Sequence, residues 1–312
     1  MKFYKEKINM VYREEMVSDL SVGSSKSPNK PRYLLDFLYR NRLISNFSLD
    51  ENWEPFEKEE FYLAHTRQYV DSFFAGKEPF ASSNGLYWNS QFADSVRYTN
   101  ASLFYAIERS FANPEIVQFS PTSGFHHAKP STGAGFCSFS GQVIASVKLW
   151  NKQKLRGAYI DLDGHYGNSI EDSKVFVREL NKIIPFNINP SGDHKTYIEN
   201  LVRDLNRLSS EILAGNIDYV VFCHGADSHE WDDLGSQCST EEWIHCSELV
   251  YLMINRVSQK LNRPIPLTLS LFGGYRHDDY NSVLSLHTAD LCKCLDILCG
   301  QDIRYLPIVK GR

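Results

Sequence analysis

The chain has 312 residues, of which 42% are hydrophobic and 13% aromatic, and it carries a net charge of −5. This composition supports a sizeable buried core and excludes an intrinsically disordered chain. The acidic balance also disfavours nucleic-acid binding, which usually requires a basic surface. No stretch approaches the roughly 18 consecutive apolar residues of a membrane span, and the charged first residues lack the apolar segment of a secretory signal.

The seven cysteines are scattered and form no CxxC pair, so we interpret them as buried free thiols of a reducing compartment. Together these features predict a cytoplasmic protein that binds neither nucleic acid nor membrane.

Short apolar runs alternate with amphipathic segments along the chain. Continuous apolar runs are typical of buried parallel strands, and we predict strands at residues 8–12, 116–119, 157–161, 219–223 and 266–271. Helical spacing of apolar residues predicts helices over residues 92–111, 172–184, 196–213, 240–257 and 288–298. Gly215 follows one of them as a stop signal, and Thr240 is the expected cap of the next. This alternation predicts one α/β domain over residues 1–312, with a mostly parallel central sheet flanked by helices.

Four of the predicted strands run directly into polar, reactive residues. In chain order these are His126 and His127; Asp161, Asp163 and His165; Asp227; and Gly273, Gly274 and Tyr275. Ligands of open α/β sheets bind outside the carboxyl ends of the strands. We therefore expect the four loops to converge on one site.

Two carboxylates and one imidazole of this set form a candidate metal site. Alternate residues of an extended segment face the same way, so Asp163 and His165 point to one centre, and Asp227 joins them from the next strand. Three nitrogen or oxygen ligands with one open position are typical of catalytic zinc. Because no thiolate takes part, iron(II) also fits the ligand set. The alternative is a polar turn after a strand.

The same loops resemble histone deacetylases and acetylpolyamine amidohydrolases of the arginase–deacetylase superfamily, and we expect a bacterial-type member. The resemblance runs from about residue 26 to residue 300 and rests on four motifs in order. They are GFHHA followed by GFCSF (124–128 and 135–139), YIDLDGHYGN (159–168), GADS (225–228) and GGY (273–275). It implies an arginase/deacetylase-like fold.

The resemblance also implies roles for individual residues. Asp163, His165 and Asp227 would bind zinc, His127 would act as general base and then acid, and His126 would be its electrostatic neighbour near Asp161. Tyr275 would donate a hydrogen bond to the oxyanion. Substrate contacts are expected from the side chains and glycines of the surrounding loops: Gly135, Phe136, Leu234, Gly273 and Gly274. Phe136 as an ordinary core residue is an equal alternative.

This sequence departs from the family pattern at several positions. Asn168 stands where some relatives have Asp, so it accepts a hydrogen bond from His127 but brings no charge, and we predict a lower His127 pKa than an Asp would give. A structural potassium ion near Asp161 is implied, with Asn187 as its expected side-chain ligand. Arg32 resembles an arginine at the foot of the family's internal channel, with an ordinary surface arginine as the alternative.

Three functions remain open at this point. The first is a zinc-dependent amidohydrolase that removes an acyl group from an acyl-lysine of a protein or peptide. The second is an acetylpolyamine amidohydrolase, which would need acidic groups for the distal ammonium. Leu234 stands where one polyamine-selective branch has a glutamate, although Glu230, Asp232 and Asp233 lie nearby. The third is a catalytically inactive relative that binds a partner or an acyl ligand.

Overall fold

One parallel sheet forms the centre of the computed structural model, which describes residues 2–18 and 25–311. Within these residues seven strands lie in the order β2-β1-β3-β7-β6-β4-β5, and every neighbouring pair is parallel. Their bounds are β1 Ile8–Val11, β2 Phe47–Asp50, β3 Gln118–Ser120, β4 Gly157–Asp161, β5 Phe186–Ile188, β6 Tyr219–Cys223 and β7 Leu267–Ser270. The predicted α/β class with a mostly parallel sheet is therefore confirmed.

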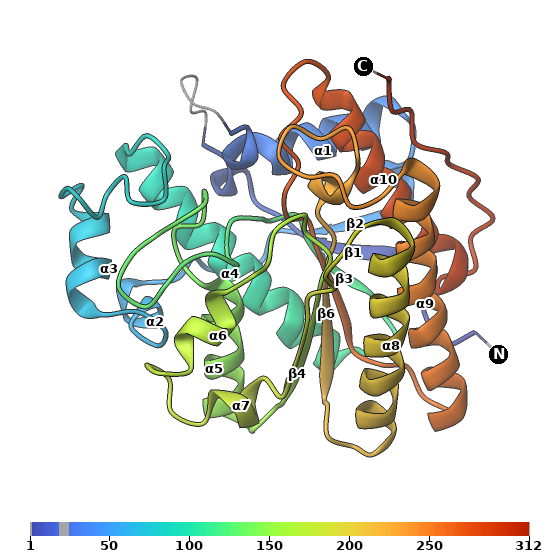
Figure 1. Cartoon of the computed structure of the whole chain (residues 1–312). Coiled ribbons are helices and arrows are strands. Elements are labelled where there is room, and N and C mark those ends of the chain that lie inside the picture. Colours follow the sequence, from blue (N-terminus) through green and yellow to red (C-terminus); the bar gives the residue numbers. More distant parts are fainter. Residues whose placement is uncertain (1, 19–24, 312) are drawn as a thin grey trace.

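Helices cover both faces of this sheet (Figure 1). In chain order they are α1 Lys30–Arg40, α2 Lys58–Phe61, α3 Arg67–Phe74, α4 Ser90–Ala112, α5 Gly141–Gln153, α6 Ser169–Ser173, α7 Leu180–Ile183, α8 His194–Leu213, α9 Thr240–Leu261 and α10 Tyr280–Ile297. Helices α4 and α5 pack together on one side, while α8, α9 and α10 form a consecutive layer on the other. None of the helices in the described ranges has the length and apolar character needed to cross a bilayer.

The central strands are buried on both faces of the sheet. Every residue of β4 and β6 is buried, as expected for strands enclosed between two helical layers. All seven cysteines are buried free thiols, which confirms the prediction for them. The sequence pattern that marked these strands is thus a direct consequence of the layered architecture.

Two sequence predictions about helices are wrong in detail. The segment 172–184 is not one helix, because α6 and α7 are separated by a turn in which Glu179 takes a left-handed conformation with φ of 65°. The cap of α9 is Ser239 rather than Thr240: its hydroxyl accepts from the Glu242 N–H, and the Glu242 carboxylate accepts from the Ser239 N–H. The stop at Gly215 is confirmed, since α8 ends at Leu213 and Gly215 has φ of 75°.

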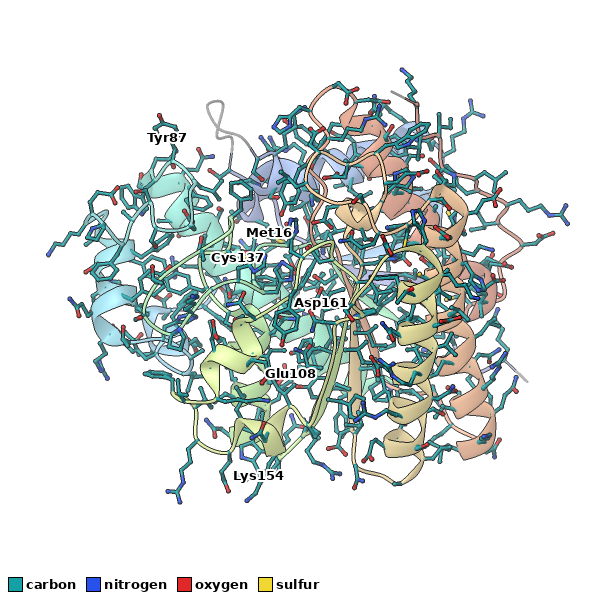
Figure 2. The ribbon with its side chains drawn as sticks, viewed as in Figure 1. Met16, Tyr87, Glu108, Cys137, Lys154 and Asp161 are labelled. Atoms are coloured by element: carbon teal, nitrogen blue, oxygen red, sulfur yellow. The ribbon has the colours of Figure 1, made fainter. Side chains whose placement is uncertain are left out.

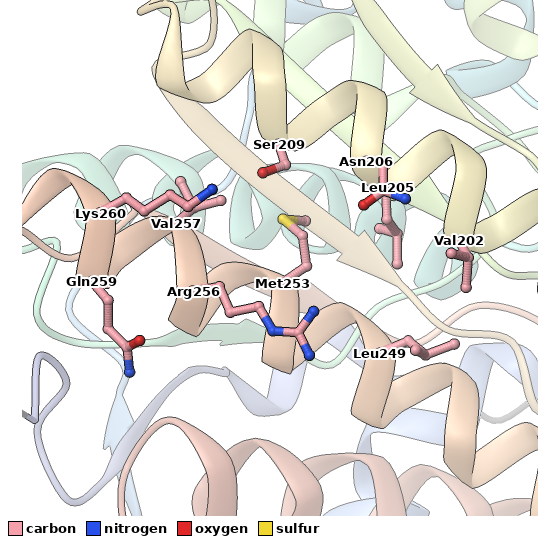
Figure 3. Close-up of a pocket in the computed structure, with 10 residues that line it drawn as sticks. All are labelled: Val202, Leu205, Asn206, Ser209, Leu249, Met253, Arg256, Val257, Gln259 and Lys260. Carbon is pink, nitrogen blue, oxygen red and sulfur yellow. The ribbon is translucent and has the colours of Figure 1, made fainter.

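A groove of about 450 Å³ lies between α8 and α9 (Figure 3). Its walls combine apolar side chains such as Leu205 and Met253 with the polar ends of Arg256 and Lys260. Its lining residues all belong to these two helices, so the groove is separate from the loops at the strand ends.

Candidate metal and catalytic site

The four reactive loops leave four adjacent strands. Strands β3, β7, β6 and β4 are consecutive in the sheet, and all point the same way. Their carboxyl ends therefore meet at one edge, where Asp161 ends β4 near the centre of the molecule (Figure 2). The structure thus brings the sequence-predicted residues of all four loops together.

The predicted metal ligands converge on one point. The ligand atoms of Asp163, His165 and Asp227 lie within 4.8 Å of one another. The His165 Nδ1 is 3.0 Å from Asp163 Oδ1 and 3.0 Å from Asp227 Oδ2. Both carboxylate side chains are completely buried, whereas His165 is about one third exposed. Two buried carboxylates and one accessible imidazole are a suitable donor set for a divalent cation.

The electrostatics of this group also call for a cation. Burial, followed by the charge of Asp163, raises the pKa of Asp227 to about 7. The two carboxylates repel each other when both are ionised, and a bound cation would relieve this repulsion. Gly273 leaves room for the Asp227 carboxylate, because a Cβ at this position would lie 2.0 Å from Asp227 Oδ2. The Gly273 N–H also donates to Asp163 Oδ2 over 2.8 Å. The residues present therefore fit a bound metal ion.

His126 is held on the carboxylate side of the site. Its Nδ1 is 3.0 Å from Asp161 Oδ2, and its Nε2 is 3.6 Å from Asp163 Oδ1. Burial would lower the pKa of His126, but Asp163 and Asp161 outweigh it and raise the pKa to about 9. Its ring lies 4.1 Å from that of His127, centroid to centroid, so the charge of His126 acts on the neighbouring imidazole.

His127 has different partners. Its Nδ1 lies 2.9 Å from Asn168 Oδ1, as expected from the sequence. Burial and the charge of His126 lower its pKa, and the bond to Asn168 offsets only part of that shift. Gly135 allows this position, because its φ is 50° and a Cβ would come within 2.6 Å of the His127 ring. The geometry thus gives Gly135 a packing role against the imidazole.

Tyr275 reaches the site from the loop after β7. Its ring centroid is 5.5 Å from that of Phe136 and 6.3 Å from that of His165. Burial and the charges of Asp163 and Asp227 raise the pKa of Tyr275, so its hydroxyl stays protonated and can donate. The Tyr275 N–H donates to Asp232 Oδ2 over 2.8 Å, which ties this loop to the one carrying Asp227.

Gly274 and Phe136 shape the same surroundings. Gly274 has φ of 141°, and a Cβ there would meet the Val283 side chain at 2.6 Å, so this glycine serves the path of the loop. Phe136 also has a left-handed backbone, with φ of 62°, and its ring is partly exposed beside Tyr275. Phe136 also packs against the hydrophobic core, so its predicted contact with a substrate stays a prediction.

Lys30 is buried next to the site, whereas Arg32 is not. Arg32 lies at the surface in an ion pair with Glu14. Lys30 is fully buried, and its Nζ donates to the Phe272 carbonyl. Burial lowers the pKa of Lys30 to about 8 against the opposing pull of Asp227, Asp163 and Asp232. Of the two interpretations of Arg32, the ordinary surface arginine is confirmed, and nothing in the local sequence marks Lys30 as buried.

The expected potassium ligand, Asn187, lies on β5, and its Oδ1 is buried with no hydrogen-bond partner in the described part of the chain. Asn187 pairs in register with Tyr159, two residues before the end of β4. Asn189 instead lies beside Asp161, where its Oδ1 accepts from the Gly167 N–H over 2.8 Å. Asn189 lines a cavity of about 180 Å³ together with Asp161, Asp163, His165, Tyr197 and Gln237. Asn189 is thus a neighbour of the carboxylates that the sequence analysis did not name, and the potassium site with Asn187 stays a prediction.

Comparison with known proteins agrees with this geometry. The family profile of the histone deacetylase domain matches residues 24–179, which is half of the chain. The chain belongs to the histone deacetylase family. The match includes the paired histidines, Asp163 and His165, whereas Asp227 and Tyr275 lie beyond it.

Individual relatives of this deacetylase-family chain are distant. Histone deacetylase 8 of Xenopus tropicalis is 33% identical over 93 residues, which cover 28% of this chain and 25% of that protein. Histone deacetylase 2 of Oryza sativa subsp. japonica is 29% identical over 97 residues, covering 31% and 18%. These matches thus span a quarter or less of the relatives' own lengths.

The fold comparison covers nearly the whole chain. The crystal structure of the HDA15 HD domain superposes with a TM-score of 0.73 over 97% of this chain and 91% of that one. The sequence identity in this match is 18%, so the comparison establishes a shared fold.

Proposed function

We propose that the protein is a zinc-dependent amidohydrolase that removes an acyl group from the side chain of acyl-lysine in a protein or peptide. The observation that carries this proposal is the convergence of the ligand atoms of Asp163, His165 and Asp227 within 4.8 Å. The rings of His127 and Tyr275 lie 6.0 and 6.3 Å from that of His165, centroid to centroid. Membership of the histone deacetylase family supports the reaction class.

The proposed chemistry assigns one task to each group. A zinc ion bound by the three ligands would supply Lewis acidity that polarises the amide carbonyl and acidifies the attacking water. His127 takes the proton of that water at Nε2, since its Nδ1 is engaged by Asn168. The Tyr275 hydroxyl donates to the oxyanion as the tetrahedral carbon forms. His127 then protonates the leaving nitrogen, the C–N bond breaks, and a carboxylate and a free amine result.

The surrounding acids favour lysine over a polyamine. The Asp232 carboxylate accepts from the N–H groups of Tyr275 and Leu234, so it is used within the protein. Asp233 accepts from the His277 N–H over 2.8 Å and from its imidazole. Leu234 itself is exposed and apolar, and therefore offers nothing to a distal ammonium group.

Glu230 keeps the polyamine reaction as the second candidate. It is exposed on the same loop, and a carboxylate is the partner that a distal ammonium needs. If a polyamine is the substrate, Glu230→Gln should raise the KM for N-acetylspermidine and leave the hydrolysis of a neutral acetyl-lysine peptide unchanged.

A direct comparison of kcat/KM tests the proposal. Zinc-loaded protein should hydrolyse an acetyl-lysine peptide with a higher kcat/KM than N-acetylspermidine, and a chelator should abolish both reactions. A large preference for the polyamine would overturn the assignment to lysine. Absence of hydrolysis of any acyl-lysine, acylpolyamine or simple amide would overturn the enzymatic proposal itself and favour the inactive relative.

A further inference from the structure

The amide of Asn168 links the outer histidine to a second carboxylate. Its Oδ1 lies 2.9 Å from His127 Nδ1, and its Nδ2 donates to Asp172 Oδ2 over 2.6 Å. Three side chains thus form a chain of hydrogen bonds that runs from the imidazole to Asp172. Asp172 does not reach the metal ligands or the histidines directly, and the reaction described above does not use it.

Helix α6 sets the spacing of this chain. Asn168 is the residue before the helix, and the Asp172 N–H donates to the Asn168 carbonyl over 2.9 Å, as expected one turn later. Side chains four residues apart on a helix lie on the same face. The start of α6 is in turn fixed to the histidine loop, because the Ser169 N–H donates to the His126 carbonyl over 2.8 Å.

An asparagine beside a catalytic imidazole has an orientation problem that an aspartate lacks. A carboxylate presents two equivalent acceptors, whereas an amide presents an acceptor at one end and donors at the other. With its oxygen toward His127, Asn168 requires a proton on Nδ1 and leaves Nε2 as the basic nitrogen. With its nitrogen toward His127, it would require an unprotonated Nδ1 and would move the proton to Nε2, where it blocks base catalysis.

The Asp172 carboxylate resolves this choice. It only accepts hydrogen bonds, so it holds the NH₂ end of Asn168 and turns the oxygen toward His127. Its charge also polarises the amide and makes the oxygen a stronger acceptor. The adjacent Glu171 is engaged elsewhere, in an ion pair with Lys174 at 2.6 Å, and so provides a matched acid that does not contact the amide.

We propose that Asp172 is a positioning residue that fixes the Asn168 amide and thereby the Nδ1-protonated tautomer of His127. This inference rests on the proposed function, in which His127 is the general base. An aspartate at position 168 would orient His127 by itself. Here Asn168 contacts His127, and the carboxylate of Asp172, one helical turn further on, orients Asn168.

A double-mutant cycle tests this role. In the wild-type background, Asp172→Ala should lower kcat about 10–100-fold, the range typical of partners that orient a catalytic imidazole, with little change in KM. Asp172→Asn keeps an acceptor without the charge and should lose less, and Glu171→Ala should keep the wild-type rate. In the Asn168→Asp background there is no amide to orient, so Asp172→Ala should cost nothing or restore activity by removing a neighbouring like charge.

The outcome of the cycle separates positioning from a structural role. Equal losses in both backgrounds would mean that Asp172 merely supports α6, and no loss in the wild-type background would mean that Asn168 is oriented without it. Either result overturns the proposal.

A spectroscopic arm makes the test independent of turnover. Nitrogen-15 NMR of the zinc-loaded protein should show His127 protonated at Nδ1 in the wild type and a mixture of tautomers in Asp172→Ala. An unchanged tautomer in the variant would overturn the positioning role even if the protein proved to hydrolyse no amide. Failure of the proposed function and failure of this inference are thus read from different measurements.

Discussion

His126 and His127 are neighbours in the chain, yet the fold gives their imidazoles opposite surroundings. The inner half of the site is His126 with Asp161, Asp163 and Asp227, and here buried carboxylates raise the pKa of the histidine to about 9. The outer half is His127 with Asn168 and Tyr275, and here burial and the charge of His126 lower the pKa of the histidine.

This difference explains how one short loop serves two purposes. A histidine that favours its charged form balances the carboxylates, whereas a histidine that favours its neutral form accepts a proton. The partners that β4 and α6 present therefore decide the role of each imidazole, and adjacency in sequence does not. The first three variants below disturb one half or make it resemble the other, and the fourth lies outside both.

Removal of a metal ligand should have the largest effect because it dismantles the inner half. Asp227→Ala leaves one carboxylate and one imidazole, so we expect loss of bound zinc and a rate at the level of the uncatalysed reaction. Elemental analysis and hydrolysis of an acetyl-lysine peptide measure the two effects. Asp218→Asn is the control. Asp218 forms an ion pair with Arg156 and directly precedes the first residue of β6, at the end of the strand away from the site. Full zinc content and rate in Asp227→Ala would show that Asp227 is not a ligand of the catalytic metal.

Loss of the tyrosine hydroxyl should disable the outer half while the inner half stays intact. Tyr275→Phe removes the oxyanion donor, and removal of one such donor typically lowers kcat by about 10²–10³-fold. Zinc content and KM should stay close to the wild-type values because the phenyl ring still packs against Phe136. Steady-state kinetics with the acetyl-lysine peptide measure this, and a wild-type kcat would remove Tyr275 from the reaction.

Asn168→Asp should make the outer half resemble the inner one. A carboxylate at 2.9 Å from His127 Nδ1 would raise the pKa of that histidine, because a negative charge favours the imidazolium. Because the base must be neutral to accept a proton, the acidic limb of the kcat/KM profile should move to higher pH. A pH–rate profile between pH 5 and pH 9 shows the shift. An unchanged limb, or one moved to lower pH, would mean that His127 is not the group that titrates.

His65 lies outside both halves and should change stability alone. It is buried, with Nδ1 2.9 Å from the Lys129 carbonyl, and its Nε2 accepts from the Ser140 N–H. Burial lowers its pKa from 6.5 to about 4. As pH falls below 6.5, His65 is protonated in the unfolded chain but not yet in the folded protein. The free energy of unfolding therefore decreases between pH 6.5 and pH 4, by up to about 1.4 kcal/mol per pH unit.

Urea unfolding at pH 7, 6 and 5 measures this contribution. In His65→Gln the free energy of unfolding should change less steeply with pH, by up to about 1.4 kcal/mol per pH unit, which corresponds to one proton. We expect the variant to be less stable than the wild type at pH 7. The same slope in variant and wild type would show that His65 does not titrate between these pH values.

The sequence was most informative where the chain is buried. Strands β4 and β6 were predicted because both of their faces are covered, so each reads as an apolar run that ends in reactive residues. Strands β2 and β5 were missed: they have four and three residues, and each contains partly or fully exposed positions, so neither forms such a run. The edge of the sheet is thus less visible in sequence than its centre.

Within the site, motif residues were easier to predict than their supporting contacts. Asp163, His165 and Asp227 follow strand ends, where topology alone brings them together. The burial of Lys30 depends on how α1 packs against the loop containing Phe272, which no local pattern records. The contact of Asp172 with Asn168 was also not predictable. It depends on α6 beginning at Ser169, whereas the sequence predicted a helix that begins at Asp172.

The most direct test of the central claim is metal-dependent hydrolysis of an acetyl-lysine peptide. The rate of the purified protein should fall to background after chelation and return when stoichiometric zinc is added, while Asp163→Ala should show no recovery. Hydrolysis that continues at the same rate after complete removal of metal, or that persists in Asp163→Ala, would contradict the account.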